Sequence, residues 1–436
     1  MKTKKILCLL LALVFALSMT ACSSGGNSEG GKTAKRSADG LWNKTFEGVT
    51  LKRILWYTPS ESEAALVKQF EERTGAKIVD EIVDYENYNT KIANSIAAGD
   101  PYDIGYIYGA FFPTQIIAGM YQPIDTAWMA SEYLLDSSSA ETIAQGGFDI
   151  NKMDFYKWNN NYYGFSNYWD VDMMVLYYRT DLFAEAGLKS PNDYVAAGEW
   201  NLDTFLECAK SLTNTRAGIY GYSAGGENTR SYAEFVSAQG TQIVAYDSNG
   251  VPSQNLGDSK VLDGLNYIQK MTSGASKVID GEANFRKGTA AMSIDGLYEA
   301  PKMMNDSNVP ANVKNNWDIA PIPLAKSNQG GAYPCDWLKA IGIVNGSPNG
   351  EAVAAFALHM SQGKGDNIWE EYLSEEQVLR ITPYYANINY ANYAYGTLGE
   401  DYVTMIARIM GGEDISQLIS EYKTSFKAQI DKIINE

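Results

Sequence analysis

VTLKRILWYTPSESEAALVKQFEERTGAKIVDEIV, residues 49–83, is the stretch that decides the fold class. Residues 49–57 form a short, largely apolar run that predicts a strand, and Pro59 follows it closely. Ser60 begins the S-x-x-E spacing of a capping box, which predicts a helix that stops at Gly75. Residues 76–83 predict a second strand. A strand, a helix and a strand in this order are typical of an α/β layer with parallel strands.

The same alternation continues along the chain. Asp84 is placed to cap a helix, residues 102–108 predict a third strand, and a further helix ends at Gly119. A hairpin is expected over residues 155–165, with its turn at Asn159 to Asn161. Later strands are expected at 171–178, 219–223, 289–294, 317–322 and 338–344, and helices at 180–186, 202–212, 229–239 and 258–273. The chain from Gly350 onward is expected to be mostly helical. The length favours two domains.

The N-terminus has the pattern of a secretory leader. Three lysines precede an apolar run over residues 6–19 that is too short to cross a bilayer comfortably. The run ends in Ser-Met-Thr-Ala-Cys at residues 18–22, which resembles a bacterial lipobox, and the resemblance implies that Cys22 carries lipid and becomes the new N-terminus. Residues 23–40 are rich in Ser, Gly, Lys and Ala, so we expect a flexible tether. Together these features predict an extracytoplasmic protein that is lipid-anchored to the cell membrane.

Charge and cysteine content narrow the function classes. The leader removes three of the 35 basic residues and none of the 52 acidic ones, which leaves a net charge of −20. Such a chain repels nucleic acid, and no basic stripe with interleaved aromatics is present. After Cys8 and Cys22 are set aside, only Cys208 and Cys335 remain, and we expect free thiols, with Cys208 buried on a helix. The 30 tyrosines outnumber the 14 phenylalanines, which favours rings that face a ligand.

Several apparent catalytic motifs do not hold in context. Residues 26–33 match the phosphate-loop pattern, but they lie in the tether, where no strand precedes and no helix follows. The single histidine, His359, lies on a predicted helix with nothing around it that indicates catalysis, so a structural role is expected. No pattern for a metal site or a cofactor is present, and we expect neither. The many acidic residues leave a pair for glycoside hydrolysis open as an alternative.

An ordered set of segments resembles the extracellular solute-binding proteins of bacterial ABC importers, in the maltose/oligosaccharide-binding group. The segments span nearly all of the chain after the leader. The most specific match is LYYRTDLFAEAGL at residues 176–188, and others are FEERTG at 70–75, AGDPYDI at 98–104, GMYQPID at 119–125, EWNLDTF at 199–205, FRKGTAAM at 285–292 and APIPL at 320–324.

This resemblance implies an α/β, two-lobed, periplasmic-binding-protein-like clamp with a hinge and a ligand cleft between the lobes. The first lobe is expected to comprise residues 41–171 and 342–376, and the second residues 172–341 and 377–436. Residues 1–22 are the leader and 23–40 the tether. A ligand that bridges both lobes would shift the equilibrium between open and closed states through its extra contacts in the closed state.

The resemblance also implies where the ligand is held. Aromatic rings can cover the faces of a sugar, and carboxylates and amides can accept its hydroxyl protons. Ser60 and Glu61 fall in the first ligand loop of the family, although helix capping explains Ser60 equally well. Tyr108 is chosen among the rings after the third strand, and Tyr298 is expected to stack on a sugar. The remaining expected contacts are Trp169, Asp170, Asp172, Asp295, Gly296, Asp336 and Trp337, with Tyr384, Tyr385 and Asn387 as further candidates.

The sequence therefore predicts a monomeric binding protein, not an enzyme, that captures a sugar or short oligosaccharide and delivers it to the permease subunits of an ABC transporter. A different solute, such as a polyamine, is the main alternative, because acidic residues suit a cation equally well. A surface enzyme that cleaves glycans and an adhesion or scaffold lipoprotein are two further alternatives.

Overall fold

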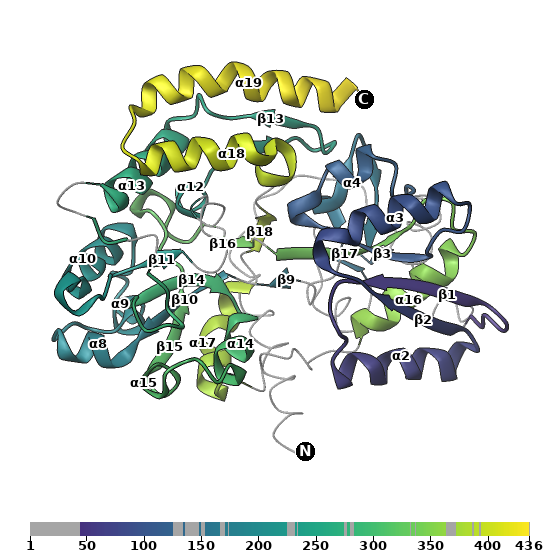
Figure 1. Ribbon diagram of the computed structural model, residues 1–436, viewed down its shortest axis with the longest axis horizontal. Helices are drawn as coiled ribbons and strands as arrows, with labels where there is room; N and C mark the ends of the chain where they lie inside the picture. Colours follow the sequence, from purple (N-terminus) through teal and green to yellow (C-terminus); the bar gives the residue numbers. More distant parts are fainter. Residues whose placement is uncertain are drawn as a thin grey trace, which may run out of the picture.

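The computed structural model describes residues 44–124, 134–135, 148–149, 153–165, 171–172, 174–224, 232, 234–273, 277–279, 283–331, 333–335, 337–362, 372–385, 388–391 and 394–435. Two separate β-sheets, each covered by helices, form the two lobes of the molecule (Figure 1). This confirms the predicted α/β, two-lobed fold. The predicted lobe boundaries stay a prediction.

The first sheet contains the parallel strands that residues 49–108 predict. Its order is β2-β1-β3-β17-β8, and β9 pairs with β17 beyond this path. β2 and β3 run parallel to β1, while β17 runs antiparallel to β3. The strand bounds are β1 Thr50–Leu55, β2 Lys77–Ile82, β3 Ile104–Tyr108, β8 Gly164–Phe165, β9 Val171–Asp172 and β17 Trp337–Ile343.

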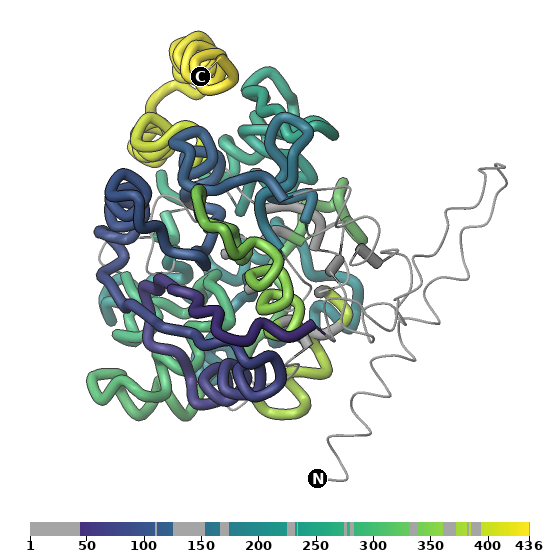
Figure 2. The backbone as a smooth tube through the Cα atoms, turned by 90° about the vertical axis from the view of Figure 1, so that its right-hand side faces the viewer, coloured from purple at the N-terminus to yellow at the C-terminus, as the bar shows by residue number. Residues whose placement is uncertain are grey.

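Helices cover both faces of this first sheet. In Figure 1, α3 and α4 lie above it and α2 lies below it. Figure 2 shows α16 running across the face turned to the viewer, near α2, and the rings of Phe70 and Phe356 join these two helices with centroids 5.3 Å apart. The bounds are α2 Glu61–Thr74, α3 Tyr88–Ala97, α4 Thr114–Ile117 and α16 Gly350–Gln362, with short 3-10 helices η2 Tyr85–Asn87 and η3 Gly109–Phe111.

The second sheet has the order β11-β14-β10-β15. β10 lies in its middle and alternates between two apolar layers. Leu176 and Tyr178 pack in the layer that contains α10 and α13, whereas Val175 and Tyr177 face the layer that contains α14. The strand bounds are β10 Met174–Arg179, β11 Ser223–Ala224, β14 Met292–Gly296 and β15 Trp317–Pro321.

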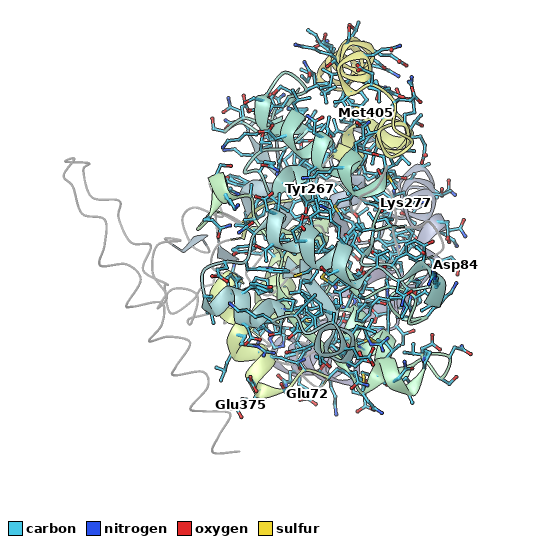
Figure 3. The ribbon with its side chains drawn as sticks, turned by 90° about the vertical axis from the view of Figure 1, so that its left-hand side faces the viewer. Glu72, Asp84, Tyr267, Lys277, Glu375 and Met405 are labelled. Atoms are coloured by element: carbon cyan, nitrogen blue, oxygen red, sulfur yellow. The ribbon has the colours of Figure 1, made fainter. Side chains whose placement is uncertain are left out.

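Ten helices of the described residues surround the second sheet. Figure 3 shows Tyr267 of α13 in the middle of the face turned to the viewer and Met405 of α18 above it. Their bounds are α8 Thr180–Glu185, α9 Pro191–Ala196, α10 Leu202–Leu212, α12 Glu234–Ser237, α13 Ser259–Thr272, α14 Glu299–Asn305, α15 Ala311–Lys314, α17 Glu375–Tyr385, α18 Ala394–Met410 and α19 Ile415–Asn435. Four strand pairs lie outside the main sheets: β4 Leu134–Leu135 with β5 Phe148–Asp149, β6 Lys157–Trp158 with β7 Asn161–Tyr162, β12 Val244–Tyr246 with β13 Pro252–Gln254, and β16 Tyr333–Cys335 with β18 Ile388–Ala391.

The backbone passes between the lobes where β9 and β17 pair. Trp337 is opposite Asp172 and Leu338 is opposite Val171. From Lys339 onward, β17 instead pairs with β3 of the first sheet. In Figure 1, β9 and the start of β17 lie between the two sheets, which is the place expected for a hinge.

The lobes also touch away from this pairing. The Thr114 hydroxyl of α4 donates a hydrogen bond to the carbonyl of Gly396 in α18 over 2.8 Å. The backbone N–H of Asn160, in the β6–β7 turn, donates to the carbonyl of Asn249 over 2.7 Å. In Figure 1, α18 reaches over toward α4, above β9. The two lobes therefore have a second region of contact.

Local sequence signals are confirmed at several element ends. Ser60 caps α2 by accepting a hydrogen bond from the Glu63 backbone N–H, and Gly75 ends the helix with a φ of 76°. Asn201 caps α10. Asn159 and Asn160 take positive φ in the predicted hairpin turn, a conformation that asparagine tolerates better than most residues.

Other predicted bounds are wrong. β14 starts at Met292 and runs through Gly296, so Asp295 and Gly296 belong to the strand, whereas the strand expected at 289–294 stops before them. Pairing with β10 holds them there, because Val175 is opposite Asp295 and Met174 is opposite Gly296. The helix expected over residues 229–239 is, within the described residues, only α12.

Candidate functional site

An aromatic cluster lies at the carboxyl ends of the parallel strands in the first sheet. Trp56 directly follows β1 and is its centre, with ring centroids 4.8 Å from Tyr88, 5.5 Å from Tyr108 and 5.8 Å from Tyr106. Tyr108 is the last residue of β3 and pairs with Lys339 near the start of β17. The carboxyl end of β3 therefore lies beside the part of β17 that is nearest to β9. Loops at this edge of a parallel sheet are where ligand-binding groups converge.

A pocket of about 530 Å³ opens beside this cluster, between the ends of β1 and β2 and the start of α3. Trp56, Tyr57 and Tyr85 give it aromatic walls. Ile82 and Val83 add apolar surface, and the other lining side chains are polar: Thr58, Asp84, Glu86, Asn87, Thr90, Lys91 and Asn94. Rings together with carboxylate and amide oxygens are the groups that a sugar requires, since a sugar offers apolar C–H faces and a rim of hydroxyls.

A chain of polar contacts holds Tyr57 in the wall of this pocket. The Tyr57 hydroxyl donates to Glu63 Oε1 over 3.2 Å, and Arg53 Nη1 pairs with the same oxygen at 2.8 Å. Arg53 is fully buried on β1 and also contacts Asp80 of β2 with two hydrogen bonds of 2.8 Å each. Burial alone lowers the pKa of Arg53, but the bonds and charges of Asp80 and Glu63 outweigh it and raise the pKa above its usual range. The guanidinium therefore stays charged and fixes the carboxylate that orients Tyr57.

For Tyr57, burial raises the pKa well above its ordinary value, and the nearby Glu63 carboxylate adds to the shift. The hydroxyl therefore remains protonated at every physiological pH. It can donate one hydrogen bond and accept another, and Lys339 Nζ donates to it over 3.3 Å. Tyr57 thus connects the pocket wall to β17, the strand that pairs with both β3 and β9.

Among the predicted residues of the first lobe, Tyr108 lies in the aromatic cluster but is buried, with 5 % of its surface exposed. Ser60 and Glu61 lie at the start of α2, one turn beyond Thr58, the last pocket residue of that loop. The Ser60 hydroxyl accepts from the Glu63 backbone N–H over 3.1 Å, so its capping role is shown. The roles of all three in ligand binding stay predictions.

In the second lobe, the structure brings Asp295 and Tyr298 together. The Tyr298 hydroxyl donates to Asp295 Oδ1 over 2.6 Å, and the Gly296 backbone N–H donates to the same atom over 2.9 Å. Lys302 Nζ lies 4.2 Å from the Tyr298 ring centroid. Asp295 is therefore placed to orient the Tyr298 ring, while Lys302 contacts that ring from the first turns of α14.

A small cavity beside Asp295 has a volume of about 10 Å³, which is room for about one water molecule and no sugar. Glu299 lines it, pairs with Arg286 Nε at 2.7 Å, and is 8 % exposed. Burial, and then the neighbouring Asp295 charge, raise the pKa of Glu299 to about 7, against the opposing effect of Arg286. The cavity lies among charged side chains and is too small for a sugar, so it is not a ligand pocket.

The predicted contacts at the hinge are seen only in part. Asp172 and Trp337 are backbone partners across β9 and β17. Trp169, Asp170, Asp336 and Asn387 lie outside the described residues, as does Cys22, the predicted lipidation site.

The pocket residues Trp56, Tyr57, Asp84 and Tyr85 were not among the predicted contacts. Their signal in the sequence is position: each follows directly after a parallel strand. The sequence prediction used Asp84 as a helix cap, but Asp84 makes no side-chain capping bond to η2, and it lines the pocket instead.

Residues expected to be structural are confirmed as such. His359 is 6 % exposed, its Nε2 lies 2.9 Å from the Leu66 carbonyl oxygen, and burial lowers its pKa. Cys208 is a free, buried thiol on α10. Within the described ranges no three acidic, histidine or cysteine side chains are grouped as metal ligands, and none of the helices found there has the length and apolar character to cross a membrane.

The fold matches many solved structures at low sequence identity. The sugar-binding protein MalE of Xanthomonas citri superimposes with a TM-score of 0.68 at 15% identity, covering 88% of this chain and 98% of that one. The galacto-N-biose/lacto-N-biose I-binding protein of an ABC transporter from Bifidobacterium longum, solved with lacto-N-biose, gives 0.65 at 13% identity, with 89% and 99% covered. The GacH receptor of Streptomyces glaucescens, solved unliganded and with acarbose, gives 0.63 at 16% identity, with 88% and 98% covered.

No curated protein sequence matches the chain. The model of the family described as bacterial extracellular solute-binding protein matches residues 57–362, which is more than half of the chain and includes Tyr57, Tyr85, Tyr298, β9 and β17. The chain therefore belongs to the bacterial extracellular solute-binding protein family.

Proposed function

We propose that this protein captures a carbohydrate outside the cell and delivers it to the permease subunits of an ABC transporter. The observation that carries the proposal is the pocket at the ends of β1 and β2, which is lined by three aromatic side chains together with carboxylates, amides and two threonine hydroxyls. Its volume of about 530 Å³ suits a ligand of one or two sugar rings.

The proposal includes the second lobe. Tyr298 is half-buried and held by Asp295, so it is available to contact a sugar from the opposite side when the lobes close. Binding to both lobes would favour the closed state because the ligand makes contacts there that it lacks in the open state. MalE and the two other structural relatives are described as sugar-binding or were solved with an oligosaccharide or acarbose, which supports the same ligand class.

Attachment to the membrane is also part of the proposal. Cys22 follows the leader, and lipid on that residue would hold the protein at the cell surface through the tether of residues 23–40. The protein would act as a monomer that binds and releases its ligand without changing it.

Calorimetric titration of the purified protein against oligosaccharides and polyamines tests the ligand class. Tyr85→Ala removes an aromatic wall of the pocket from a half-buried position. Losing an aromatic contact at a binding hot spot costs about 2 kcal/mol or more, which weakens affinity about thirtyfold.

Tyr194→Ala is a matched control, because Tyr194 is also half-buried but lies on α9 of the other lobe, where its ring stacks on Trp200. Its affinity should equal that of the parent. If only polyamines of the panel bind, the ligand class is a cation and not a carbohydrate. Binding of a sugar that Tyr85→Ala leaves intact would show that this pocket is not the site.

A further inference from the structure

Lys339 is a cation at the ligand side of the first sheet. It lies near the start of β17, opposite Tyr108 at the end of β3. Its Nζ is 4.5 Å from the ring centroid of Tyr57 and 5.3 Å from that of Tyr106. The side chain is half-buried, so its ammonium is partly removed from water.

Within the described residues, no carboxylate lies within ion-pair distance of this ammonium. The nearest acid along the hydrogen-bonded chain is Glu63, which contacts Lys339 only through the Tyr57 hydroxyl. Arg53 already pairs with Glu63 and with Asp80 at 2.8 Å each. The two carboxylates of this cluster are therefore committed to the guanidinium, and Lys339 is held by two aromatic rings and one hydroxyl.

Such an arrangement leaves Lys339 able to accept an anionic partner. An ammonium has three donor hydrogens, and the described residues accept one of them. A partly desolvated cation is stabilised most when an anion completes its contacts. The two rings, which offer only their π faces, compensate this charge weakly by comparison.

The ligand pocket is the adjacent space from which such an anion would come. Tyr57 is shared: its side chain contacts Lys339 and lines the pocket. Lys339 is therefore one tyrosine ring away from the pocket, on the side of the hinge. The carboxylates of Asp84 and Glu86 and the ammonium of Lys91 line the pocket itself, so the anionic group of the ligand is expected on the Lys339 side of Tyr57 and not beside these carboxylates.

We propose that Lys339 recognises an anionic group on the ligand, so that the preferred solute is an acidic saccharide that carries a carboxylate or a sulfate. The inference rests on the proposed function and names the substrate class within it. A lysine acts as a point charge and does not require one planar anion geometry, so both anionic groups are included. A cation at this position also disfavours a polyamine.

The test uses matched pairs of oligosaccharides, each a neutral sugar and its uronic-acid or sulfated counterpart, titrated calorimetrically into the purified protein. We expect the acidic member to bind about tenfold more tightly or better, and its affinity to fall as salt is raised. Lys339→Met should remove this preference and leave the affinity for the neutral member within about threefold. The uronic and sulfated arms show which anion is preferred.

Lys68→Met is the control, because Lys68 lies on α2 of the same lobe with 74 % of its side chain exposed, so the change in net charge is the same. It should keep the preference for the acidic sugar. Lys339→Arg retains the positive charge and should also keep it, which tests the inference if Lys339→Met proves unstable in thermal melts.

Two results separate the proposals. If the protein binds neutral sugars as tightly as acidic ones, the role of Lys339 is overturned and carbohydrate capture still stands. The same holds if the Lys339→Met variant keeps the preference for acidic sugars. A protein that binds no saccharide of either kind overturns both.

Discussion

The buried carboxyl of Glu299 makes a prediction about stability and pH. Its pKa is raised from 4.5 to about 7, first by burial and then by Asp295. Between these two values the folded protein holds a proton that the unfolded chain has released. The free energy of unfolding must therefore fall as pH rises through this window, and the stabilising effect of the bound proton is complete only below about pH 4.5.

The size of the effect follows from the shift. A difference of one pKa unit corresponds to about 1.4 kcal/mol, so a rise from 4.5 to about 7 corresponds to about 3 kcal/mol. Because Glu299 is 8 % exposed, solvent screens this little. Such a loss is a large fraction of the free energy of unfolding of a typical protein, which is about 5–15 kcal/mol.

Glu299→Gln isolates this titration, because glutamine has nearly the same shape and no charge. We expect the unfolding free energy of the variant to rise relative to the parent by about 3 kcal/mol between about pH 4 and pH 8. Urea unfolding, followed by tryptophan fluorescence at a series of pH values, measures it. Loss of the Arg286 pair adds an offset at high pH, so the trend with pH is the diagnostic quantity.

For a control variant, Glu413→Gln, we expect a pH dependence of the unfolding free energy with the opposite sign. Hydrogen bonds from Arg408 lower the pKa of Glu413, so its stabilising effect is present above its ordinary pKa. Glu413→Gln should lose stability relative to the parent as pH rises toward about 4.5, the ordinary pKa of this carboxyl, and the difference should stay constant at higher pH. If the difference between Glu299→Gln and the parent were independent of pH, Glu299 would be ionised throughout, and the pairing with Arg286 would outweigh burial.

Two further predictions concern the ligand and the membrane. Tyr298→Ala should weaken ligand binding about thirtyfold, while Tyr298→Phe keeps the ring and retains most of the affinity; calorimetric titration measures both, and full affinity in Tyr298→Ala would remove this residue from the site. Cys22→Ala should release the protein from membranes or block its processing, as cell fractionation would show, and a variant that is processed and retained like the parent would contradict lipid attachment.

The sequence predicted several element ends in both lobes because their signals are local. The cap at Ser60, the stop at Gly75 and the cap at Asn201 each depend on one or two residues and their own backbone, and each lies where expected. The hairpin turn at Asn159 and Asn160 depends equally on local conformation.

The end of β14 was not predictable in this way. Asp295 and Gly296 have the composition of a turn, but pairing with Val175 and Met174, more than a hundred residues earlier, holds them in a strand. Long-range pairing of this kind leaves no local trace.

The pocket was missed for a related reason. It joins the end of β1 to residues after β2, and no single segment contains enough of it to form a motif. Asp84 carries an ambiguous signal, because an aspartate after a strand and before a helix serves equally as a cap or as a ligand. In the structure Asp84 makes no side-chain capping bond and lines the pocket together with Trp56 and Tyr85.

The second contact between the lobes has a mechanical consequence. The lobes are joined at the pairing of β9 with β17, and they also meet where Thr114 contacts Gly396 and Asn160 contacts Asn249. Two rigid bodies that are held at two separate places can rotate freely only about the line through both. Any lobe rotation that preserves both regions of contact must therefore take place about a line that passes through them.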